Sequence, residues 1–197
     1  MKRIIWLLIV ISTIDVSFGQ GSYKDSLQSF IDEYVKTHAV VKGNDKKYLQ
    51  FYPINEKFRF ICRFERKENS PWFQMETSGP IKQTYRIYGK AYFTLNDTTV
   101  SLCIYQSQDL MKTVQYKDYL FIPFLDATTG DETYESGRYI DLFISNIVSD
   151  KLVIDFNRAY NPYCAYTKGY NCPVPPKENR ISVAIKAGEK KYLKASH

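Results

Sequence analysis

The chain has 197 residues, 44% of them hydrophobic and 16% aromatic, and its formal net charge is +6 at pH 7. The length suits one domain with a sizeable core. The Lys and Arg residues are spread along the chain, whereas proteins that bind nucleic acid usually gather them on one face. We therefore read the charge as solvated surface and expect no nucleic-acid partner.

The first 19 residues have the pattern of a secretory signal peptide. A basic start at residues 2–3 is followed by an apolar run over residues 4–14 and by small residues up to Gly19. We expect cleavage after Gly19, so that a single β-rich domain over residues 20–197 is exported to the periplasm or secreted. No later stretch approaches the roughly 18 apolar residues of a transmembrane helix, so we expect no membrane span after signal removal. A permanent N-terminal anchor is the alternative.

One amphipathic helix is predicted over about residues 23–40. Its apolar residues recur at helical spacing with polar residues between them, namely Leu27, Phe30, Ile31, Tyr34 and Val35. We expect this face to pack against the rest of the domain, with a partner-binding helix as the alternative. Residues 42–47 are predicted to form a polar loop.

From about residue 48 to residue 186 the pattern changes to the two-residue period of β-strands. Apolar and polar residues alternate over residues 57–65, 85–95 and 100–105. Asn96 and Asp97 separate the last two runs and predict a hairpin. Within the 85–95 run, the alternation places Ile87 toward the core and Tyr88 outward.

The second half of the chain continues the β pattern. Residues 119–125 form an apolar run that Pro123 assigns to a strand end, an edge or a bulge. Three further strand-like runs follow at residues 139–147, 151–157 and 181–185. Many short strands, frequent turns and one N-terminal helix predict a mainly β fold, either an antiparallel sandwich or a partly closed barrel.

Several kinds of chemistry are disfavoured by what the sequence lacks. After signal removal its histidines are His38 and the terminal His197, and neither is an obvious partner for a nucleophile in the C-terminal half. The chain has no GxSxG, GxGxxG, P-loop or HExxH string. The sequence therefore argues against classical hydrolase, dinucleotide-binding and zincin chemistry, and we expect no cofactor.

The four cysteines allow three complete pairings. Cys164 and Cys172 bracket a loop, and an exported protein makes a disulfide between them the default expectation. Such a bridge contributes about 2 to 3 kcal/mol by restricting the unfolded chain. Cys62 lies among phenylalanines and reads as a buried thiol. Zinc ligands usually lie closer in sequence than the loop pair, so no metal site is predicted.

Two aspartates inside apolar runs give the sharpest functional signal. Asp141 lies between Ile140 and Leu142, and Asp155 lies between Ile154 and Phe156. Carboxylates that line a cavity must be paired or have shifted pKa values, so these two would bind or protonate a ligand there. We expect them to share one pocket with Arg138 and the Tyr-rich loop, provided that the two runs form a hairpin. Ordinary structural salt bridges are the alternative.

The loop after Asp155 combines tyrosine and asparagine with four prolines. Flat rings with polar edges, held by proline, suit a small polar or planar ligand, and a rigid plug at a barrel end is the alternative. The leading hypothesis is an exported β domain that binds a small molecule. A histidine-independent enzyme with paired carboxylates and a structural envelope protein are the alternatives. Ligand identity and oligomeric state stay open. The candidate ligand-binding residues are Arg86, Arg138, Tyr139, Asp141, Asp155, Asn157, Asn161 and Tyr166.

Two long strings resemble a known family. They are FIPFLDATTGDETYESGRYIDL over residues 121–142 and DFNRAYNPYCAYTKGYNCPVPPKENRISVAIKAGEK over residues 155–190. Both are similar to the bacterial and archaeal family catalogued as domain of unknown function 1684 (DUF1684). The similarity continues upstream through METSG and YRIYGKAYFTL, so it covers most of the mature chain. The resemblance implies a shared fold and no established reaction.

Overall fold

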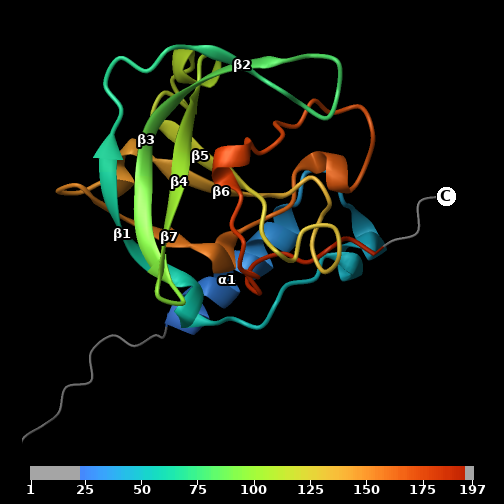
Figure 1. The fold of residues 1–197 in the computed structure, drawn as a ribbon. Coiled ribbons are helices and arrows are strands. Elements are labelled where there is room, and N and C mark those ends of the chain that lie inside the picture. The colour runs from blue at the N-terminus through green and yellow to red at the C-terminus, as the bar shows by residue number, and fades with distance from the viewer. Residues whose placement is uncertain (1–22, 194–197) are drawn as a thin grey trace, which may run out of the picture.

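The computed structural model describes residues 23–193. The predicted signal peptide, the mature terminus at Gln20 and His197 lie outside the described residues. The described chain forms a seven-stranded sheet in which every neighbouring pair is antiparallel, and the sheet curls into a half-barrel (Figure 1). Helix α1 (Tyr23–Thr37) lies near the lower ends of the strands in this view. The prediction of a mainly β fold with one N-terminal helix is confirmed.

The sheet order is β6-β5-β4-β3-β1-β7, with the short β2 paired on β3. The strands are β1 (Arg59–Arg66), β2 (Phe73–Met75), β3 (Gln83–Leu95), β4 (Thr98–Ser107), β5 (Tyr119–Phe124), β6 (Arg138–Phe143) and β7 (Lys151–Asp155). Short 3-10 helices connect them: η1 (Gly43–Tyr48), η2 (Glu56–Phe58), η3 (Leu110–Lys112), η4 (Ile144–Asn146), η5 (Phe156–Arg158), η6 (Tyr163–Ala165) and η7 (Lys177–Asn179). The first and last strands in this order, β6 and β7, are therefore the outer strands of the half-barrel.

Helix α1 buries Leu27 and Ile31, two residues of the predicted apolar face. It ends at Thr37, before the predicted boundary near residue 40. The reason is local: Nδ1 of His38 accepts hydrogen bonds from the backbone N–H groups of Val40 and Val41 at 3.2 and 2.8 Å. This turn replaces further helical hydrogen bonds. The polar loop predicted next contains the 3-10 helix η1.

The predicted β3–β4 hairpin is present, and both turn residues have positive φ, 48° at Asn96 and 59° at Asp97. The predicted facing of residues 87 and 88 is wrong. A register shift between Ile87 and Gly89 reverses the alternation, so that Tyr88 joins the main core and Ile87 packs on the opposite face. Gly89 allows β3 to lie close to Phe64 of β1 at this point, because a Cβ at position 89 would lie only 2.4 Å from the ring of Phe64.

The two faces of the sheet carry different clusters. The main core contains fully buried residues such as Ile104, Leu120, Ile122, Ile154 and Phe156. A smaller cluster on the other side holds Met75, Tyr85, Cys103, Tyr105, Phe121 and Tyr139. Cys62 and Cys103 are buried free thiols in these two clusters, and burial raises the pKa of Cys62 to about 12.

The third strand-like run, residues 181–185, is not a strand, so that prediction is wrong. Its main chain runs beside the loop after β5, where Ile181 N–H donates to the carbonyl of Leu125 at 2.8 Å. Ile185 N–H donates to the carboxylate of Asp126 at 2.6 Å. The apolar residues of the run still join the main core, which explains the strand-like alternation in the sequence.

Candidate functional site

The two outer strands enclose the candidate site. The prediction that they pair as one hairpin is wrong, because β6 pairs with β5 and β7 pairs with β1. The tight turn at Ser149 and Asp150 does exist, with φ values of 48° and 57°. Helix η4 separates β6 from this turn and redirects the chain, so the strands reach opposite ends of the sheet and leave an open seam between them.

A pocket of about 470 Å³ lies at this seam, and we call it the seam pocket. Asp141 and Asp155 both line it. The rest of the wall comes from α1, the strands β1, β6 and β7, and the 3-10 helices η4 and η5 with the turn after η4. Its residues are Tyr23, Ser26, Leu27, Arg59, Ile140, Leu142, Ser145, Asn146, Val148, Val153 and Arg158.

Asp155 is held in one orientation by two neighbours, Tyr23 and Asn157. The hydroxyl of Tyr23 donates to Oδ1 at 3.0 Å and to Oδ2 at 2.9 Å, and the backbone N–H of Asn157 donates to Oδ1 at 3.0 Å. The Asn157 amide also donates to the Tyr23 hydroxyl and to the carbonyl of Asn55, both at 2.9 Å. Burial and the neighbouring carboxylate raise the pKa of Tyr23, so its hydroxyl remains a donor. Asn157, a predicted site residue, therefore positions Asp155.

Asp141 is held by two tyrosines. The hydroxyls of Tyr119 and Tyr160 both donate to its Oδ1, at 2.7 and 2.6 Å. Although part of the residue is exposed, loss of water around the carboxyl group raises the pKa of Asp141, and the two hydroxyl donors oppose this shift. Within residues 23–193 no hydrogen bond or ion pair occupies Oδ2. That oxygen is therefore available to a ligand.

Two arginines at the same pocket lack carboxylate partners in the part of the chain described. The guanidinium of Arg158 lies over the ring of Phe30 at 4.5 Å, and that of Arg59 lies over the ring of Tyr23 at 5.7 Å. Neither forms an ion pair within residues 23–193, and both residues are exposed. Arg59 was not among the sequence candidates, because an arginine on the polar face of a strand looks the same whether it meets solvent or a pocket.

Arg138 does not join the two aspartates, so the expectation of a shared pocket is wrong for this residue. Its side chain is 1% exposed, and its guanidinium lies 3.3 Å from Asp126. It also donates to the carbonyls of Ile185 at 2.9 Å and Glu189 at 3.2 Å. This pair fixes the loop after β5 to the C-terminal segment, and a buried charge with such partners is structural.

Arg86 and Tyr139 also lie away from the seam pocket. Arg86 donates from Nε to the side-chain oxygen of Gln106 at 2.9 Å and lies over the ring of Trp72 at 4.8 Å. Tyr139 packs edge-on against Phe121 at 5.6 Å, and its hydroxyl donates to the carbonyl of Pro173. Neither residue lines the seam pocket.

Asn161 and Tyr166 meet at a second polar centre built around Glu189. The carboxylate of Glu189 accepts from the hydroxyl of Tyr166 at 2.7 Å, from that of Tyr34 at 3.1 Å and from the backbone N–H of Asn161 at 2.8 Å. Glu189 is 0% exposed, and burial raises its pKa to about 7. The sequence analysis missed it because an acid in a basic C-terminal segment gives no sign of burial.

His38 lies closer to the loop than the sequence suggested. Its ring centroid is 4.6 Å from that of Tyr166, in an edge-to-face arrangement. Nδ1 accepts two backbone hydrogen bonds, so the proton is on Nε2, which faces no hydrogen-bond acceptor in the described chain. Burial lowers the pKa of His38 to about 4. The imidazole is therefore a structural cap rather than a base.

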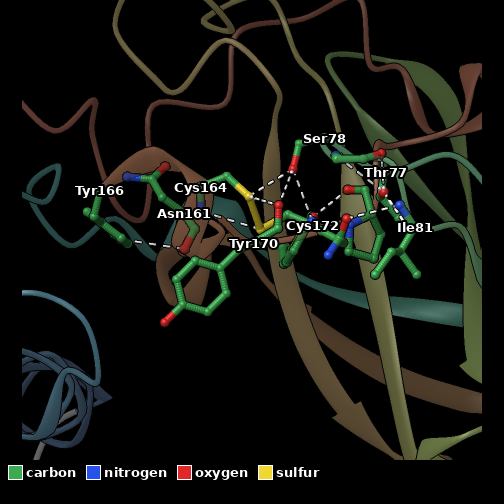
Figure 2. Close-up of a disulfide and its surroundings, with 12 residues drawn as sticks. Thr77, Ser78, Ile81, Asn161, Cys164, Tyr166, Tyr170 and Cys172 are labelled. Atoms are coloured by element: carbon green, nitrogen blue, oxygen red, sulfur yellow. Dashed lines mark hydrogen bonds between the residues drawn. A yellow bond between two sulfur atoms is a disulfide. The ribbon is translucent and has the colours of Figure 1, made fainter. Parts of the chain in front are cut away.

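The Cys164–Cys172 disulfide is present, as predicted, with a Cα–Cα distance of 6.4 Å. Figure 2 shows it bound to Ser78, whose hydroxyl lies 2.8 Å from the sulfur of Cys164. The backbone N–H of Cys172 donates to this hydroxyl at 3.1 Å, and Ser78 N–H donates to the carbonyl of Cys172 at 2.9 Å. The disulfide loop is thus attached to the segment after β2.

Metal and membrane features were also sought in residues 23–193. No group of three or more His, Cys, Asp or Glu residues in this range is placed to hold a metal ion. In the same range, none of the helices has the length and apolar character needed to cross a bilayer.

The geometry defines a mainly β half-barrel protein with a polar pocket at its open seam. Residues 45–190 match the family described as "Protein of unknown function (DUF1684)", and the chain belongs to this family. It is similar to the uncharacterized protein from gene locus rrnAC0354 of Haloarcula marismortui, whose structure was solved by solution NMR. The two are 27% identical with a TM-score of 0.66, over 88% of this chain and 96% of that one. No curated protein matches the chain.

Proposed function

We propose that the protein is exported as a single domain beginning at Gln20 and that it binds a small polar ligand in the seam pocket. The observation that carries the proposal is that unpaired arginines and oriented carboxylates line one pocket. Arg59 and Arg158 lack carboxylate partners within the described chain, and they line the same pocket as the oriented carboxylates of Asp141 and Asp155. The Cys164–Cys172 disulfide supports export, since disulfides persist in oxidising compartments.

The positions of the donors and acceptors define the kind of ligand. The guanidiniums supply planar forks of N–H donors suited to a carboxylate or phosphate. Asp141 presents a free acceptor oxygen beside the hydroxyls of Tyr119 and Tyr160. A compact molecule with an anionic group and hydrogen-bond donors meets both requirements, and a purely apolar one meets neither.

Binding is favoured over acid–base catalysis by the state of Asp155. The single hydroxyl proton of Tyr23 is shared between its two oxygens, and Oδ1 also accepts from the backbone N–H and the side-chain amide of Asn157. A general base must reach a substrate proton directly or through one water, and this carboxylate is committed to its own neighbours.

A larger hollow in the described chain is a weaker candidate. It has a volume of about 810 Å³ and lies beside the disulfide. Of the sequence candidates, only Tyr166 lines it, and of its three lysines Lys42 and Lys168 are exposed and Lys191 is half-buried. The hydroxyl of Tyr166 is committed to Glu189.

A ligand screen by thermal shift tests the proposal. A compound that binds only the folded state raises the melting temperature, by the equivalent of about 2.7 kcal/mol when present at about 100 times its Kd. Arg158→Ala is expected to remove the shift for any anionic hit. Arg180→Ala is the matched control, because that arginine is exposed and does not line the pocket. The assignment would be contradicted if both variants lost the thermal shift equally, or if anionic hits still raised the melting temperature of Arg158→Ala.

A further inference from the structure

The seam pocket is bounded by the outer edges of β6 and β7, the two end strands of the sheet. Hydrogen bonds next to the pocket show which main-chain groups point toward it. In β6, the N–H of Tyr139 donates to the carbonyl of Tyr160 at 2.9 Å, and its carbonyl accepts from Tyr160 N–H at 3.0 Å. The main-chain groups of Tyr139 therefore point away from β5. Pro123, its partner in β5, has no N–H to offer, which agrees with this assignment. Because these groups alternate along a strand, those of Asp141 point the same way, toward the pocket.

The opposite wall has the same character. Lys151 exchanges both main-chain hydrogen bonds with Val148, at 2.9 and 3.0 Å, so its groups point away from β1. By the same alternation, the N–H and C=O groups of Val153 and the N–H group of Asp155 point toward the pocket that both residues line. β6 and β7 are the end strands of the sheet, so within residues 23–193 no further strand pairs with these edges of Asp141 and Val153, whereas the carbonyl of Asp155, the N-cap of η5, accepts the first hydrogen bond of that 3-10 helix.

Two facing strand edges with free donors and acceptors are suited to one kind of occupant. An extended peptide satisfies such edges by adding a strand, with affinity from its main chain rather than from its side chains. The free stretch is short, since residues 140–142 of β6 and only Val153 and Asp155 of β7 border the pocket. It therefore has room for a few residues.

Charge fixes which end of such a peptide enters. Arg59 pairs with Asp155 in the β1–β7 ladder, and Arg158 follows Asp155 in η5, so both guanidiniums lie at the Asp155 end of the seam. An α-carboxylate is the anionic group that every short peptide carries at one end. Bidentate binding by arginine discriminates it from a neutral amide.

We propose that the seam pocket binds a short extended peptide with a free C-terminal carboxylate, which enters as an added strand between β6 and β7. This inference rests on the proposed function and narrows its ligand class. The peptide main chain pairs with Asp141 on one side and with Val153 and the N–H of Asp155 on the other, and its carboxylate is bound by Arg59 and Arg158. Its side chains contribute little to recognition.

The test uses three probes and the full mature protein. Trialanine, trialanine C-terminal amide and trialanine methylated on its central nitrogen are titrated while amide chemical shifts are followed by NMR. Trialanine should shift the resonances of β6 and β7. The amide should bind about tenfold more weakly or worse, because it lacks the charge-assisted hydrogen bonds. N-methylation, which removes a ladder donor, should also weaken binding.

Two variants complete the design. Arg158→Ala should abolish the preference for the free carboxylate, and Arg180→Ala should preserve it. Equal affinity for all three probes, or shifts confined to other regions, would overturn the peptide assignment. If trialanine fails while another small anionic compound shifts the seam resonances, the peptide inference falls and the proposed function stands. If no probe or screened compound shifts them, both fall.

Discussion

Replacing Glu189 with glutamine should make the stability of the protein less sensitive to a rise in pH from acidic to neutral. Glu189 is 0% exposed and forms no ion pair within residues 23–193, and burial raises its pKa from an ordinary 4.5 to about 7. Because the folded pKa is the higher one, its stabilising contribution is complete below about pH 4.5 and is lost as the pH rises to about 7. The difference corresponds to about 3 kcal/mol, since one pH unit is equivalent to about 1.4 kcal/mol.

The glutamine variant cannot ionise, so it avoids this loss. Its NH2 group replaces one acceptor oxygen and faces a donor, namely a hydroxyl of Tyr34 or Tyr166 or the N–H of Asn161, which costs about 1 to 3 kcal/mol at every pH. The informative quantity is therefore the change with pH. The free energy of unfolding of Glu189→Gln minus that of the wild type should rise by about 3 kcal/mol between about pH 4.5 and about pH 8.

Urea denaturation at several pH values measures this difference, and it allows a control. Glu56→Gln changes an exposed glutamate at the start of η2 and should give a difference that does not vary with pH. Burial lowers the pKa of His38 to about 4 in both proteins, so the imidazole cancels from the comparison. A difference for Glu189→Gln that stays constant, or that falls as the pH rises, would refute the account of a buried carboxylate without a cation.

Two further predictions concern the disulfide and the N-terminus. Replacing both Cys164 and Cys172 with serine should lower the free energy of unfolding by about 2 to 3 kcal/mol, measured under non-reducing conditions. Serine at the buried thiols Cys62 and Cys103 tests core packing instead. Reductant should leave the free energy of unfolding unchanged only in the variant without Cys164 and Cys172, because that variant has no disulfide to reduce. Mass spectrometry of the exported protein should find a chain that begins at Gln20, and an intact Met1 in that fraction would contradict the signal-peptide prediction.

Patterns between near neighbours in the chain predicted much of the fold. The two-residue alternation located β1, β3 and β4, and Asn96-Asp97 located the β3–β4 hairpin. Both were accessible because a strand face and a turn type depend on side chains a few residues apart. The Cys164–Cys172 pairing was accessible for the same reason, since eight positions separate the two residues. The bulge at Gly89 was missed because it depends on how closely β1 approaches β3.

The tertiary structure alone decided which polar residues act together. Arg138 and Asp155 were expected at one site, yet Arg138 pairs with Asp126 in the interior and Asp155 lines the seam pocket. Burial of Glu189 depends on α1 and the disulfide loop, which are distant in sequence, closing over it. The seam exists because β6 and β7 pair with different neighbours. The free energy that selects those strand pairings comes from contacts across the whole sheet, and alternation along a single strand does not predict such contacts.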